Sequence, residues 1–181
     1  VNRVQSNTAE GVSVQSGATG VDLGVNFIAR NGGLGIDLAP AGVNPIDTDT
    51  GSGGANFRQN FPELFSAAGT AETGTVTGRL RSANGTYEVL MYAGSCDASG
   101  YGEGQRFVGG AVVHITNGSD VADGSANFIA PVSTTGSGSG LEGTSITAIA
   151  TRTRPGDSGS SSEFSACIDF EIPQLFGDGF E

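Results

Sequence analysis

The sequence predicts an all-β chain in which terminal coils of a parallel β-helix are followed by an antiparallel β-sandwich of the immunoglobulin type. The 181 residues include 31 glycines, and their apolar runs are short and separated by Gly, Ser, Asn and Asp, as expected for strands joined by turns. Helix signals are nearly absent, apart from one possible helical turn over 61–68 that is too short to be stable alone. The expected strands also differ before and after residue 73. The earlier ones are very short, whereas the later ones are long and alternate apolar with polar residues.

Residues 1–40 are predicted to form the last coils of the β-helix. Their apolar runs are only a few residues long, and similar segments begin at Gly11 and Gly33, 22 residues apart. A spacing of about 20–25 residues with Asn/Gly corners is typical of stacked coils, and about three coils are needed for stability. Because this region holds fewer than two full coils, we expect further coils upstream, or in neighbouring subunits.

An acidic connector, residues 41–72, contains the candidate metal site. Asp47, Asp49 and Asn56 offer oxygen ligands, and Gly51 permits a tight turn between them. Ca²⁺ prefers such ligands, often from loops with alternating Asp residues. The alternative is an acidic turn exposed to solvent.

Residues 73–172 are predicted to form the sandwich, and residues 173–181 a C-terminal tail. Six alternating segments with turn signals between them suit a two-sheet antiparallel fold, and a Gly/Ser-rich loop is expected over 133–143. The six segments are 75–81, 86–92, 106–116, 126–131, 145–151 and 163–170.

The two cysteines, Cys96 and Cys167, are interpreted as one disulfide of a secreted or cell-surface protein. An acidic chain rich in Gly, Ser and Thr favours this interpretation. In the chain-entropy treatment, closing this loop contributes roughly 4 kcal/mol to stability. The alternative is two unpaired buried thiols in a cytosolic protein.

Composition excludes several function classes. All eight basic residues are Arg, which removes lysine-dependent chemistry, and one His with two Cys cannot build a four-ligand His/Cys zinc site. A net charge of −11 opposes phosphate binding, so nucleic acid is not expected as a partner. No apolar run approaches the ~20 residues of a membrane-spanning helix.

Catalytic interpretations are weak. The Gly-Asp-Ser-Gly string at 156–159 is similar to that around a serine nucleophile, but His114 is the only candidate base for Ser158 and lacks the expected neighbours. Four carboxylates could enter a carbohydrate cleft as a pair, although a structural role at coil corners and strand ends is preferred. They are Asp22, Asp37, Glu103 and Glu163.

Several strings together resemble the C-terminal region of bacterial exported right-handed β-helix proteins of the CSLREA-domain type. They occur at 31–38, 47–51, 59–62, 96–104, 146–151 and 162–167, and the ending at 175–181 is similar to that of exported proteins of some gammaproteobacteria. The resemblance covers most of the chain and implies an architecture and an extracellular setting, but no defined reaction.

We therefore expect a non-catalytic structural or adhesive module in which the sandwich caps the open end of the β-helix, with Ca²⁺ as a possible stabilising ion. An uncovered end would expose strand edges and an apolar interior. The alternative is an accessory module that binds polysaccharide, or a fragment of a carbohydrate-active β-helix enzyme.

Overall fold

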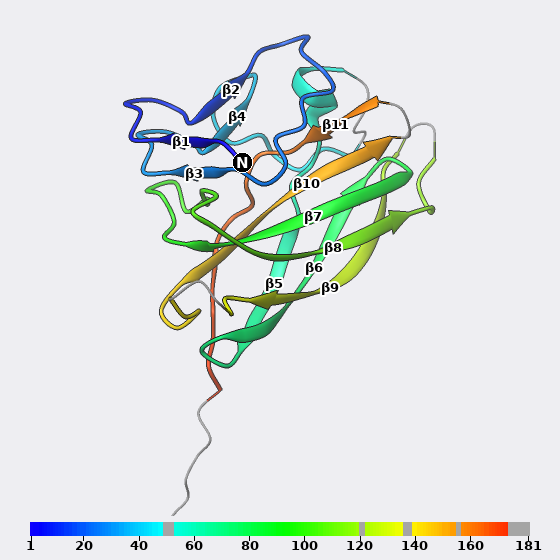
Figure 1. The fold of residues 1–181 in the computed structure, drawn as a ribbon. Helices are drawn as coiled ribbons and strands as arrows, with labels where there is room; N and C mark the ends of the chain where they lie inside the picture. Colours follow the sequence, from blue (N-terminus) through cyan, green and yellow to red (C-terminus); the bar gives the residue numbers. More distant parts are fainter. Residues whose placement is uncertain (49–52, 120–121, 136–138, 155–156, 174–181) are drawn as a thin grey trace, which may run out of the picture.

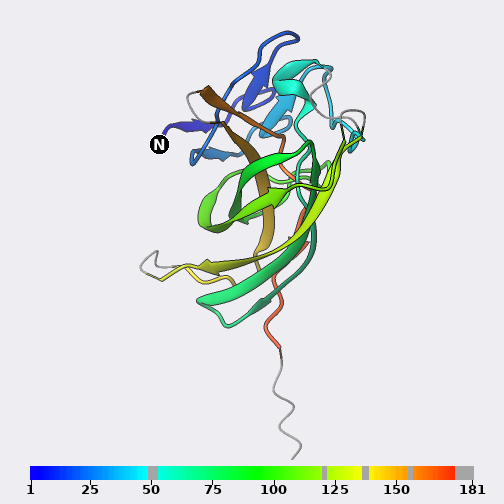
Figure 2. The same ribbon diagram turned by 90° about the vertical axis from the view of Figure 1, so that its right-hand side faces the viewer.

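The computed structural model describes residues 1–48, 53–119, 122–135, 139–154 and 157–173. Over these residues the chain is all-β, with one short 3₁₀ segment at Ala55–Arg58. Figure 1 shows two parts: short strands at one end of the molecule, and a large curved antiparallel sheet below them. The last described residues lie at the opposite end from the short strands (Figures 1 and 2).

The N-terminal part consists of four three-residue strands in two parallel pairs. β1 (Arg3–Gln5) pairs with β3 (Phe27–Ala29), and β2 (Val12–Val14) pairs with β4 (Ile36–Leu38). Both pairs join residues 24 positions apart, which lies within the expected spacing of 20–25. The expected alignment of Gly11 with Gly33 was wrong, because it places the second segment two residues too early.

A repeated sequence pattern explains this register. Residues 1–14 and 25–38 share Val-Asn at the start, an Asn at position seven and a Gly followed by alternating apolar residues. The backbone repeats as well: Ser6 and Arg30 both have left-handed φ, 59° and 58°. Such a residue turns the chain sharply, so the chain bends at the same place after β1 and after β3.

The C-terminal part is one antiparallel sheet. Its hydrogen-bonded order is β11-β10-β7-β8-β9-β6-β5, and β12 pairs with β10. The strands are β5 (Glu63–Gly69), β6 (Thr73–Ser82), β7 (Gly85–Gly94), β8 (Arg106–Ile115), β9 (Gly124–Ser133), β10 (Ser145–Arg154), β11 (Asp157–Ser161) and β12 (Ile168–Asp169).

The sheet is folded into two halves around its core. β8 and β9 meet at a single paired position, Gly109 with Val132, so the halves separate there. At the opposite side the chain after β12 joins them, since Glu171 exchanges backbone hydrogen bonds with Ala67 and Gly69 of β5. The apolar faces of the long strands are enclosed between the halves, with Val76, Leu80, Val89 and Ile146 each fully buried, and with Tyr87, Met91, Ala130 and Ala148 beside them.

Two sequence expectations for this part need correction. The helical turn expected over 61–68 was wrong, because most of this segment is strand β5, which supplies the hydrogen-bonding partner that β6 needs along its edge. The strand expected over 163–170 is reduced to the two residues of β12. Within that segment Ser165 instead bonds to β10 through both its backbone and its hydroxyl.

Candidate functional site

The candidate site is the junction between the N-terminal strands and the antiparallel sheet. A second apolar cluster lies there, in which the inward side chains of β3 and β4 pack on the outer face of β7 and β10. Its buried members are Val14, Ile28, Ile36, Leu38, Ala55, Tyr92, Ile149 and Phe164. Gly35 lies so close to the Phe164 ring that a Cβ there would be 3.0 Å from it, so any larger residue would require the ring to move.

Glu103 fastens β3 to the sheet. Its carboxylate is 4% exposed and accepts hydrogen bonds from the backbone N–H groups of Arg30 (2.5 Å) and Asn31 (3.0 Å), and from the Asn31 side-chain amide (2.8 Å). The Asn31 oxygen in turn accepts the side-chain amide of Asn7 at 2.9 Å. Asn7 and Asn31, which occupy equivalent positions of the two repeats, are therefore linked to a carboxylate in the loop between β7 and β8.

Glu163 does the same for β4. It is 2% exposed and accepts the backbone N–H of Leu38 at 3.0 Å, together with the backbone and side-chain N–H groups of Asn44 at 2.9 and 2.8 Å. Burial raises the pKa of Glu163, and these hydrogen bonds oppose the rise. Each carboxylate thus accepts three hydrogen bonds from the N-terminal part of the chain, and we refer to the two as the Glu103 clamp and the Glu163 clamp.

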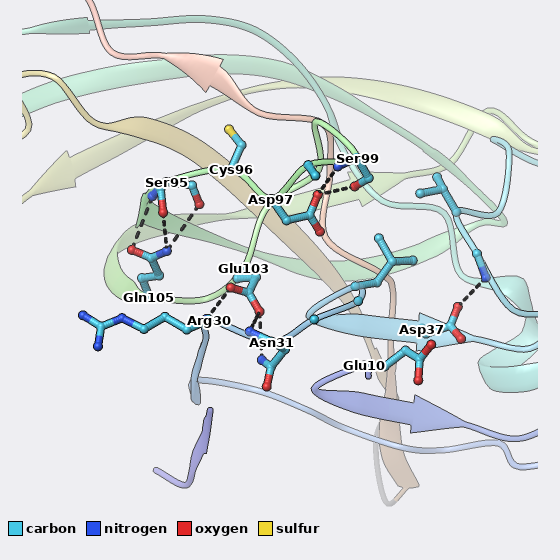
Figure 3. Close-up of a pocket in the computed structure, with 16 residues that line it drawn as sticks. Glu10, Arg30, Asn31, Asp37, Ser95, Cys96, Asp97, Ser99, Glu103 and Gln105 are labelled. Atoms are coloured by element: carbon cyan, nitrogen blue, oxygen red, sulfur yellow. Dashed lines mark hydrogen bonds between the residues drawn. The ribbon is translucent and has the colours of Figure 1, made fainter. Parts of the chain in front are cut away.

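An acidic groove of about 520 Å³ runs beside the Glu103 clamp. Figure 3 shows Glu10 and Asp37 on one wall and Asp97 on the other, while the Arg30 side chain extends away from them. Asp37 accepts the backbone N–H of Gly42 at 2.9 Å, and burial, followed by the nearby Glu10 charge, raises its pKa. Among the described residues, no three His, Cys, Asp or Glu groups are arranged to hold a metal ion.

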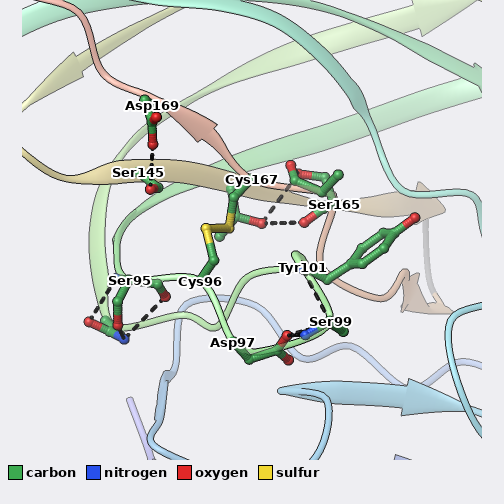
Figure 4. Close-up of a disulfide and its surroundings, with 12 residues drawn as sticks. Ser95, Cys96, Asp97, Ser99, Tyr101, Ser145, Ser165, Cys167 and Asp169 are labelled. Carbon is green, nitrogen blue, oxygen red and sulfur yellow. Dashed lines mark hydrogen bonds between the residues drawn. A yellow bond between two sulfur atoms is a disulfide. The ribbon is translucent and has the colours of Figure 1, made fainter.

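The predicted disulfide between Cys96 and Cys167 is confirmed, with a Cα–Cα distance of 6.1 Å. It joins the loop after β7 to the segment before β12 (Figure 4). The backbone N–H of Cys167 also donates to Gly100. One wall of the acidic groove is thereby linked covalently to the sheet, as is typical of proteins in oxidising compartments.

Two of the three candidate calcium ligands, Asp47 and Asn56, lie in the described residues, and each has hydrogen-bond partners within the protein. Asn56 is fully buried, and its amide accepts the backbone N–H of Val21 while donating to the carbonyls of Val21 and Ser161. Asp47 instead exchanges backbone hydrogen bonds with the Asn60 side chain. Asp49 and Gly51 lie outside the described residues.

The other candidate residues occupy structural positions where they are described. His114 is exposed on β8, with its Nδ1 at 3.0 Å from the Thr86 hydroxyl, and the side chain of Ser158 lies outside the described part. Asp22 accepts the backbone N–H of Gly24. Sequence reasoning missed Asn31 and Asn44, although a comparison of residues 1–14 with 25–38 would have shown Asn7 and Asn31 as equivalent.

Comparison with known proteins adds no family: no family model matches the chain, and no significant match was found among curated proteins. Within the described ranges, none of the helical structure is long and apolar enough to cross a membrane.

Proposed function

We propose that the chain is a non-catalytic structural or adhesive module of a bacterial extracellular or cell-surface protein. In this proposal the paired short strands are the last coils of a right-handed parallel β-helix, and the antiparallel sheet is an immunoglobulin-like sandwich that caps them. The observation that carries it is the burial of Ile28, Ile36 and Leu38 against Tyr92 and Ile149 on the outer face of the sheet, and against Phe164 of the segment after β11.

The two ends of the coil stack differ in a way that supports a cap. On the sheet side, the backbone of the second coil bonds to groups of the sheet part: the N–H of Ile28 donates to Gly104, and that of Leu38 donates to Glu163. On the other side, β1 and β2 have no further strand partner among the described residues. Val4 and Val12 of the first coil are only half-buried.

These features give the stack a direction. On the side of β1 and β2, the strand edges and a partly exposed apolar layer are uncovered. Another coil of the same kind would cover this surface. We propose that the partner there is an upstream coil of the same protein or of a neighbouring subunit. The sheet would then end the stack and prevent its closed side from adding strands.

A duplication of residues 1–24 ahead of Val1 tests this proposal. The inserted coil should stack on β1 and β2 in the 24-residue register, which would raise the midpoint of thermal unfolding and slow hydrogen exchange of amides on the outer edges of β1 and β2. A matched control carries Ser at the three inserted positions that correspond to Val4, Val12 and Val14, because that coil cannot supply an apolar layer.

An inserted coil that behaves like its Ser-substituted control would contradict the proposal. So would a more stable three-coil chain in which the amides of β1 and β2 exchange as fast as before, since stacking requires those strands to gain a partner.

A further inference from the structure

The sequence contains three Asn-Gly pairs, at 31–32, 84–85 and 117–118. In such a pair the backbone nitrogen of the glycine can attack the side-chain carbonyl carbon of the asparagine, because glycine has no side chain to hinder the approach. Ammonia leaves as a cyclic succinimide forms, and water then opens the ring to aspartate or isoaspartate. Water is the only co-reactant, and asparagine is one of the thermolabile residue types. The three pairs differ in how the fold holds the attacking nitrogen.

The pair at Asn31 is held by the junction. The backbone N–H of Gly32 donates to the carbonyl of Asn7 at 2.9 Å. The Asn31 amide donates to the buried Glu103 carboxylate at 2.8 Å. Attack therefore requires the Glu103 clamp to open, and we expect this pair to persist while the chain is folded.

The pair at Asn84 is held by the sheet. Gly85, which supplies the attacking nitrogen, is the first residue of β7 and pairs with Ile115 of β8. The Asn84 side chain is fixed as well, because its oxygen and its nitrogen both bond to the backbone of Gly118. Reaction at this pair would displace the start of β7 from the ladder.

In the pair at Asn117, a side chain holds the attacking nitrogen. The N–H of Gly118 donates to the Asn84 oxygen at 2.8 Å, and the Asn84 amide donates back to the Gly118 carbonyl at 3.1 Å. Both asparagines are exposed to water. A Cβ at position 118 would lie 2.6 Å from the backbone nitrogen of Gly124. Any larger residue there would require that backbone to shift, so packing favours the reactive pair.

We propose that Asn117 is a site of spontaneous deamidation, and that the side chain of Asn84 controls its rate. The hydrogen bond from Gly118 to Asn84 fixes the orientation of the attacking amide. An exposed side chain changes rotamer readily, and each departure of Asn84 releases the Gly118 nitrogen for attack on Asn117. This assignment does not depend on the proposed cap.

The reaction would loosen the turn between β8 and β9. The Asn117 oxygen accepts the backbone N–H of Ser125 at 2.9 Å, and its amide donates to the Ser125 carbonyl at 3.1 Å. An aspartate side chain keeps the first bond and loses the second, which leaves two acceptor oxygens facing each other. Isoaspartate also lengthens the backbone. Hydrogen exchange at the Ser125 amide should therefore be faster in the aged chain.

The test is incubation of the folded full chain at mildly alkaline pH, with each Asn-Gly pair followed by peptide mapping and mass spectrometry. Asn117 should convert faster than Asn31, and more slowly than in chain unfolded with urea. Asn84→Ala should accelerate conversion at Asn117 about fivefold or more, because the hydrogen bond that holds the Gly118 amide is absent. Asn84→Asp should stay close to wild type, since its carboxylate still accepts the Gly118 N–H.

Asn127→Ala is the matched control. It removes an exposed asparagine of β9 that forms no side-chain hydrogen bond within the described part of the chain, so the rate at Asn117 should not change. Asn31 in the same sample reports unfolding, because its conversion accelerates only when the Glu103 clamp opens.

If Asn84→Ala does not fold, Arg152→Gln decides the case. It removes the donor that holds the Asn84 carbonyl at 2.6 Å, and it should accelerate conversion at Asn117 but not at Asn31. The proposal is overturned if Asn117 converts as slowly as Asn31 in folded wild type, or if loss of the Asn84 side chain leaves the rate unchanged. It is also overturned if Asn84→Asp accelerates conversion as much as Asn84→Ala.

Discussion

The buried carboxylate of Glu163 should make the stability of the junction depend on pH. Glu163 satisfies three donors from the β4 side, yet burial still raises its pKa above the ordinary value. A raised pKa means that the folded state binds a proton more readily than the unfolded chain does. The contribution of Glu163 to stability therefore increases as the pH falls through its folded pKa, and becomes constant below the unfolded one.

A comparison of wild type with Glu163→Gln measures this effect. As the pH is lowered from 8 to 4, the difference in unfolding free energy should move in favour of wild type, by about 1.4 kcal/mol for each pH unit that separates the folded and unfolded pKa values of Glu163. Urea unfolding at a series of pH values gives this difference. Glu88→Gln, which removes an exposed carboxylate from β7, is the control. A difference that moves in favour of the variant at low pH would contradict a raised pKa.

The buried side-chain amide of Asn56 should also contribute to the stability of the folded chain. Its amide joins the segment around Val21 to Ser161, and its left-handed φ of 46° favours Asn over most residues. Asn56→Ala should lower the unfolding free energy by about 3 kcal/mol, because buried donors and acceptors lose their partners. The loss should be equal in excess Ca²⁺ and in EGTA. A loss seen only in Ca²⁺ would show that Asn56 is a calcium ligand instead.

At the scale of single elements, the sequence predicts best where side chains alternate. The strands around Val76, Val89 and Ile146 are expected within a few residues of their bounds, because one face of each must be buried. The segment 61–68 is short and apolar, a pattern that suits a helix or a strand equally. The segment becomes a strand because β6 has an edge that needs a hydrogen-bonding partner. That edge exists only once the sheet has assembled, so the local sequence does not reveal it.

A repeat of about 20–25 residues was predicted from spacing, but the register of the paired short strands required a direct comparison of residues 1–14 with 25–38. The clamps were beyond such reasoning. Glu103 is 72 residues from Asn31, and Glu163 is 119 residues from Asn44. Nothing local marks either carboxylate as a partner of the N-terminal strands, so the sequence offered both only as candidates for a carbohydrate cleft, with a structural role preferred.

At the scale of the whole molecule, the disulfide determines how firmly one clamp is attached. Glu103 lies in the loop between β7 and β8, which Cys96 links to Cys167 across a separation of 71 residues. The Glu163 side is independently fastened, because the backbone N–H groups of Ser162 and Ser165 donate to β10. We therefore expect the two clamps to respond differently to loss of the disulfide.

Replacing both cysteines by Ser should lower the unfolding free energy by about 4 kcal/mol, since the unfolded chain is no longer restrained by a large loop. Before global unfolding, the loop that carries Glu103 should open more often. Hydrogen exchange should then accelerate at the amides of Arg30 and Asn31, which bond to Glu103, and much less at the amide of Leu38, which bonds to Glu163. Wild type with its disulfide reduced should behave like the double variant. Equal acceleration at all three amides would mean that the junction opens as one unit, and that the disulfide stabilises the chain without selecting the Glu103 clamp.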